Sequence, residues 1–106
     1  MYVEIDPTQG RAEVREADDV EHFSVRTTGA ADHESLSRSL GQLGRIDDTG
    51  HAWIDIQALR DATGRSDDAE WSSGFDAMIA YATSKGWVDQ AGAAVRAHVE
   101  PVDAGG

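Results

Sequence analysis

The four histidines are the side chains best suited to bind a metal or move a proton near neutral pH, and they are His22, His33, His51 and His98. A zinc site usually shows its ligands as closely spaced pairs of histidines or cysteines. These histidines are not spaced in that way, and the chain has no cysteine. A metal site would have to be assembled from distant segments, so we predict no metal ligands.

Two pairs of neighbouring aspartates, Asp47-Asp48 and Asp67-Asp68, have the composition of an acid–base pair. Both pairs stand just before predicted secondary structure, where capping and turn formation already account for them. The glycines of Gly41-x-x-Gly44 follow a predicted helix and lack the lysine of a phosphate-binding loop, and Gly-x-Ser-x-Gly is absent. The sequence therefore predicts no catalytic residue, no cofactor and no enzymatic activity.

The stretch from Asp67 to Trp87 is predicted to be the helix on which the other elements pack. Its large apolar side chains recur at helical spacing and form one face, at Trp71, Phe75, Met78, Ile79 and Ala82. Asp67 or Asp68 is expected to cap its start, and Gly86 to end it with a positive φ. The tryptophans could line a ligand pocket, but Trp71 and Trp87 bracket this helix, which favours a place in the core.

The other elements are predicted from the spacing of their apolar residues and from the turn and capping residues between them. Strands are expected at 2–6 and 11–15, joined as a hairpin by residues 7–10, and a third at 20–26 with Phe23 and Val25 inward. The alternative for this region is a frayed acidic arm. Asp32 is expected to cap a helix carrying Leu36, Leu40 and Leu43, followed by a turn at 47–50, a strand at 51–55, a helix at 56–63, and strands at 87–89 and 94–100.

The order helix, strand, helix, helix, hairpin over residues 32–100 resembles the winged-helix variant of the helix-turn-helix. The resemblance lies in Trp53-Ile54-Asp55, Lys85-Gly86-Trp87-Val88 and Val95-Arg96-Ala97-His98-Val99. It implies an α+β fold with an added N-terminal β-hairpin, divided into an extension (1–26), a winged-helix-like domain (27–101) and a flexible tail (102–106). It also implies that the strands carrying His51 and His98 pair.

The charge bears on the DNA binding that this family implies. The chain has 20 acidic and nine basic residues, a formal charge of −11, and such a surface repels phosphate groups. Only Arg65, Lys85 and Arg96 lie near the expected reading helix and wing. A DNA-binding transcriptional regulator is therefore kept as the alternative, and nucleic acid as an unlikely partner.

The outward face of the long helix favours a protein partner. Ser73, Ala77, Ala80 and Ser84 recur at helical spacing opposite the apolar stripe, and small uncharged side chains let another helix approach closely. Alternatively, alanine and serine are simply common and tolerate solvent. We expect a small acidic interaction module that self-associates, as a homodimer. No apolar run has transmembrane length and the start lacks the pattern of a signal peptide, so the expected location is the cytoplasm, away from membranes.

Overall fold

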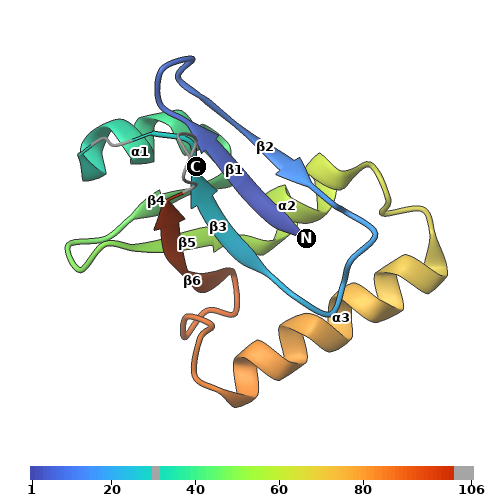
Figure 1. Ribbon diagram of the computed structural model, residues 1–106. Helices are drawn as coiled ribbons and strands as arrows, with labels where there is room; N and C mark the ends of the chain where they lie inside the picture. Colours follow the sequence, from blue (N-terminus) through green and yellow to red (C-terminus); the bar gives the residue numbers. More distant parts are fainter. Residues whose placement is uncertain (30–31, 102–106) are drawn as a thin grey trace.

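Six strands form one mixed sheet in the computed structural model, which describes residues 1–29 and 32–101 (Figure 1). The order across the sheet is β2-β1-β3-β6-β5-β4. The strands are β1 (Tyr2–Asp6), β2 (Arg11–Arg15), β3 (Ser24–Thr27), β4 (Gly44–Ile46), β5 (His51–Asp55) and β6 (Ala94–Pro101). Strand β1 is antiparallel to β2 and parallel to β3, β3 is parallel to β6, and β5 is antiparallel to both β6 and β4.

The pairing register separates the sheet into an apolar and a polar face. Val3, Val25 and Val99 are partners across three strands, and Ile54 on the next strand faces Val95, so all of them lie on one face. Three helices cover this face: α1 (His33–Leu40), α2 (Ile56–Thr63) and α3 (Ala69–Ser84). Their buried side chains join the same core, at Leu36, Leu40, Leu59, Trp71 and Phe75. The fold is therefore mixed α+β in two layers, and none of the described helices covers the polar face of the sheet.

The predicted caps at the helix starts are confirmed, and so is the predicted glycine stop after α3. Asp32, Asp55 and Asp68 each accept a hydrogen bond from a backbone N–H in the first turn of α1, α2 and α3. Gly64 and Gly86 follow α2 and α3 with φ of 68° and 78°. Because a side chain is disfavoured at positive φ, glycine suits both stops.

The apolar stripe of α3 faces the sheet as predicted, but Trp87 does not join the core. Trp71, Phe75 and Ala82 are buried, and Met78 and Ile79 are partly buried. The Trp87 N–H donates to the Ala82 carbonyl in the turn through Gly86, and the indole stays 38% exposed. The prediction of a core Trp87 is wrong, because the glycine turn carries the residue away from the buried face.

The first helix is shorter than its leucine spacing predicts. It ends at Leu40, Gly41 takes a φ of 56°, and a short 3₁₀ helix, η1 (Gly41–Leu43), follows. Gly44 then opens β4, a strand that the sequence analysis missed. A Cβ at Gly44 would collide with the carbonyl oxygen of Trp53 on β5. Gly44 therefore allows the close approach of β4 to β5.

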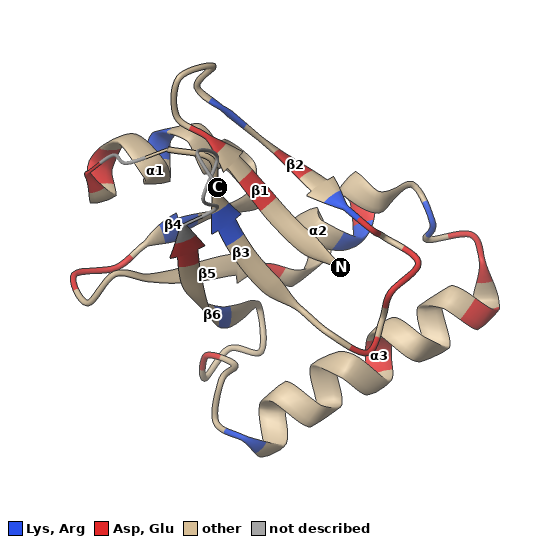
Figure 2. Ribbon diagram, in the orientation of Figure 1, with Lys and Arg blue, Asp and Glu red and all other residues tan. Residues whose placement is uncertain are grey.

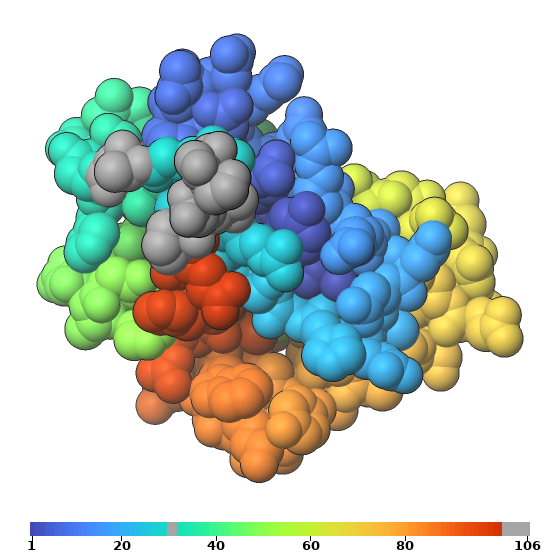
Figure 3. Space-filling model, in the orientation of Figure 1, coloured from blue at the N-terminus to red at the C-terminus, as the bar shows by residue number. Residues whose placement is uncertain are grey.

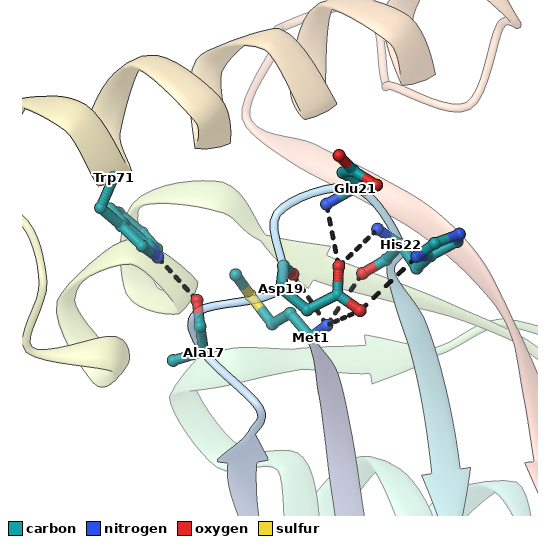
Figure 4. A network of polar contacts seen from close by, with 6 residues as sticks. All are labelled: Met1, Ala17, Asp19, Glu21, His22 and Trp71. Atoms are coloured by element: carbon teal, nitrogen blue, oxygen red, sulfur yellow. Dashed lines mark hydrogen bonds and ion pairs between the residues drawn. The ribbon is translucent and has the colours of Figure 1, made fainter.

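The segment before β3 also differs from the prediction. The strand expected over 20–26 begins only at Ser24, because residues 16–23 cross α3 instead (Figure 4). The Trp71 indole N–H donates to the Ala17 carbonyl, and the Asp19 carboxylate accepts the backbone N–H groups of Glu21 and His22. The Met1 ammonium donates to the carbonyls of Asp19 and His22.

The expected extension over 1–26 supplies β1, β2 and most of β3 to the same sheet as the later strands. Its boundary falls inside β3. The strand expected at 87–89 is reduced to one bridge between Val88 and Val95, and the expected tail over 102–106 lies outside the described residues. Within the described ranges, no helix combines the length and apolar character needed to cross a membrane.

Candidate functional site

Tyr81 and Trp87 form an aromatic pair at the end of α3. They are the large hydrophobic side chains that remain exposed among the described residues, at 58% and 38%. Their ring centroids lie 6.0 Å apart with an interplanar angle of 73°, an edge-to-face arrangement, and the Lys85 ammonium lies 5.4 Å from the Tyr81 ring centroid. Tyrosine and tryptophan are frequent anchors of binding sites because they offer a large rigid surface with a polar end.

The half of α3 that leads to this pair is uncharged. No acidic or basic residue occurs from Ala77 to Ser84, and Figure 2 shows the acidic positions of α3 confined to its first half. The Asp76 carboxylate is matched by the Arg60 guanidinium at 2.6 Å. On a chain with a formal charge of −11, about two turns of helix without a charged residue are a local exception.

All four predicted interface residues lie on this helix and are exposed, namely Ser73, Ala77, Ala80 and Ser84. The segment that crosses α3 packs beside Trp71 and Gly74, on another face. The small side chains are therefore not covered by residues 1–29. Whether they contact a partner stays a prediction.

A cleft of about 470 Å³ opens beside the aromatic pair. It lies where β3 and β6 separate, since their pairing begins only at Val25 and Val99. The start of β3, β6 and the end of α3 are neighbours on the face drawn in Figure 3. Apolar side chains from three segments line it, at Phe23, Met78, Ile79, Val95 and Trp87.

Three of the four histidines also line the cleft, from three separate segments: His22, His51 and His98. His51 and His98 are cross-strand partners, as predicted, with ring centroids 6.3 Å apart. The Thr49 hydroxyl lies 2.7 Å from Nδ1 of His51. Even so, no group of three metal-ligating side chains lies together in the described part of the chain.

The three basic residues of the nucleic-acid alternative are dispersed. Arg65 precedes α3 and pairs with Asp18 at 2.8 Å, whereas Lys85 follows the helix. A helix of 16 residues separates these ends by about 24 Å at 1.5 Å per residue. Arg96 is half-buried in the cleft and makes no ion pair within 4 Å to the acids of residues 1–29 and 32–101.

Two of the four aspartates singled out by the sequence, Asp47 and Asp68, hold a turn and a helix cap. The Asp47 carboxylate accepts hydrogen bonds from the Thr49 hydroxyl, the Trp53 indole N–H and the backbone N–H groups of Thr49 and His51. These bonds, that of the Thr49 hydroxyl foremost, lower the pKa of Asp47 well below its usual range. A carboxylate that stays ionised in this way is a poor general acid. Asp68 caps the start of α3.

Sequence reasoning did not find the cleft. Its residues come from segments as distant as His22 and Glu100, and no local spacing connects them. One feature of the sequence indicates an exposed aromatic side chain beside the cleft: Trp87 stands directly after the helix-ending Gly86, outside the apolar stripe.

Comparisons of the chain with protein-family models, curated proteins and solved structures find no match.

Proposed function

We propose that this chain is a non-enzymatic interaction module, and that the uncharged half of α3 binds a second copy of the chain. The observation that carries the proposal is the run from Ala77 to Ser84, which is exposed on its outer side yet has no charged residue. A helix that is apolar on one face normally presents charged residues on the other. Departure from this pattern at one place favours a contact surface.

Charge explains why the contact would be made here. Two copies with a charge of −11 each repel one another, and a charged side chain buried without a partner is costly. The uncharged half of α3 minimises both effects. A symmetric pair of helices would place Ala77 and Ala80 of one copy against the same residues of the other, with Tyr81 at the edge as an aromatic anchor.

Light scattering on a concentration series tests this proposal. Ala80→Arg should shift the mass from dimer to monomer, because a long charged side chain separates the helices, and the circular dichroism spectrum should not change. Ala62→Arg is the matched control, since Ala62 is an exposed helical alanine on α2. A wild-type chain that stays monomeric at high micromolar concentration refutes self-association.

The winged-helix relationship is also a proposal. It is supported by the order α1, β5, α2, α3, β6, by the antiparallel pairing of β5 with β6, and by the bridge between Val88 and Val95 at the position of a wing. This order is what favours the alternative function, a cytoplasmic transcriptional regulator that binds DNA near Arg65, Lys85 and Arg96. Retardation of a random-sequence duplex at physiological salt would select that alternative over the interaction module.

A further inference from the structure

We infer that the cleft between β3, β6 and α3 binds a small planar aromatic anion, of the class of aromatic carboxylates. This inference goes beyond self-association, because the cleft lies within one copy of the chain and the small residues Ala77 and Ala80 do not line it. Its volume of about 470 Å³ lies in the range of small-molecule sites, roughly 300–1,000 Å³.

The two sides of the cleft differ in polarity, and this difference favours an amphipathic ligand. Val95 belongs to the covered face of the sheet, while Arg96 and His98 belong to the open face. Met78 and Ile79 of α3 lie on the covered side. A ligand that enters between the separating strands therefore meets an apolar floor at its inner end and polar side chains at its outer end.

Aromatic side chains favour a flat ring over an aliphatic one. Phe23 and Trp87 line the cleft, and Tyr81 meets Trp87 edge to face at its rim. Aromatic rings attract one another in offset and edge-to-face geometries, by about 0.5–1.5 kcal/mol beyond area burial. The exposure of Tyr81 and Trp87 leaves this surface available to a ligand.

The charge of the ligand follows from Arg96. Arginine stays protonated at any relevant pH, and within the described chain this half-buried guanidinium has no carboxylate within 4 Å. His98 stands two residues further on the same face. Glu21 and Glu100 also line the cleft, and both side chains are exposed to solvent. A carboxylate can pair with the Arg96 guanidinium through two parallel hydrogen bonds.

The acidity of the whole chain opposes an anion only weakly at this range. Charges separated by more than about 8 Å are largely screened at physiological ionic strength, whereas a charge-assisted hydrogen bond acts in direct contact. The screening applies to the acidic residues outside the cleft, so Glu21 and Glu100 are the acids that a carboxylate bound to Arg96 has to avoid.

The test is a titration of the full chain with 2-naphthoate, followed by amide and indole NMR signals and by calorimetry. We expect saturable shifts of the Trp87 indole N–H, while the buried Trp71 indole does not move. The cation 2-naphthylmethylammonium and the aliphatic cyclohexanecarboxylate should each bind at least tenfold more weakly. Equal or tighter binding of the cation, or no saturable shift with 2-naphthoate, overturns the inference.

Two variants locate the site. Arg96→Gln keeps a long polar side chain and should weaken 2-naphthoate binding at least tenfold. Arg45→Gln is the matched control, because Arg45 also belongs to the open face and makes no ion pair in the described chain, but lies outside the cleft. Equal affinity of the Arg96→Gln and Arg45→Gln chains refutes the assignment. If Arg96→Gln fails to fold, His98→Asn should weaken binding severalfold, and unchanged binding refutes the inference.

The titration also separates this inference from self-association. Binding within one copy should give the same dissociation constant at protein concentrations at which light scattering finds monomer. Saturation only at concentrations at which the chain self-associates would show that one copy does not form the site.

Discussion

The indole N–H of Trp71 donates to the carbonyl oxygen of Ala17 at 2.6 Å, across 54 residues of sequence. The same indole stacks on Phe75, with ring centroids 4.9 Å apart. This one side chain therefore belongs to the core and also ties α3 to the segment that leads into β3. The position of α3 bears on both proposals, because its far end carries Tyr81 and one wall of the cleft.

Trp71→Phe should destabilise the fold by about 1–3 kcal/mol, because the Ala17 carbonyl loses its donor while most of the apolar contact remains. Urea unfolding followed by circular dichroism measures the change. Trp87→Phe is the matched control, and the exposure of Trp87 leads us to expect less than about 0.5 kcal/mol. Equal effects of the two substitutions would contradict the role of the hydrogen bond.

Gly74→Ala should also destabilise the chain, although alanine is intrinsically the better helix former by about 1 kcal/mol. A Cβ at Gly74 would lie 2.6 Å from Cγ2 of Val20, so the Val20 side chain or the segment that carries it would have to shift. Overpacking of this kind costs about 1–3 kcal/mol. We expect a net loss in denaturant melts.

The double variant Gly74→Ala/Val20→Ala identifies the cause of that loss. Removing the Val20 methyl groups makes room for the new Cβ, so the double variant should be more stable than the sum of the two single effects predicts. Strict additivity would show that Val20 and Gly74 do not act on one another.

The periodic parts of the fold could be predicted from the sequence. Spacing of apolar residues located α3 and its buried face, and the aspartates before each helix marked where the helices begin. Such signals are local, because helix geometry and capping involve residues within one or two turns.

The features that could not be predicted from the sequence depend on contacts between distant segments. The strand that begins at Gly44 could not be predicted, because nothing nearby in the sequence indicates that the Trp53 carbonyl of β5 lies against this residue. Residues 16–23 were assigned partly to a strand because the competing contact, Trp71 with Ala17, lies 54 residues away. The cleft was missed for the same reason, since it exists only after β3 and β6 have been placed side by side.

The Asp47 carboxylate provides a prediction about pH. Hydrogen bonds from Thr49, Trp53 and His51 lower its pKa in the folded chain, so between the folded and unfolded pKa values the unfolded chain binds more protons. The stabilisation is therefore present above the unfolded pKa, about 3.9, and is lost as the pH falls below it.

Asp47→Asn should accordingly be less stable than wild type at pH 7, and the difference should shrink as the pH falls from 5 to 3. Urea unfolding at several pH values measures it. Asp48→Asn is the matched control, because the neighbouring Asp48 is exposed, and we expect it to change the stability at pH 7 by less than about 0.5 kcal/mol. A deficit for Asp47→Asn that is the same at pH 7 and pH 3 would rule out the carboxylate as its source.

Salt should stabilise the folded chain. With a formal charge of −11, compaction brings like charges together and repulsion opposes folding. The Debye length falls from about 30 Å at 0.01 M salt to about 8 Å at 0.15 M, so the thermal midpoint should rise over this range. Scans near the isoelectric point are the control: there the net charge vanishes and the rise should largely disappear. If the rise persists there, a specific ion effect and not relief of self-repulsion is responsible.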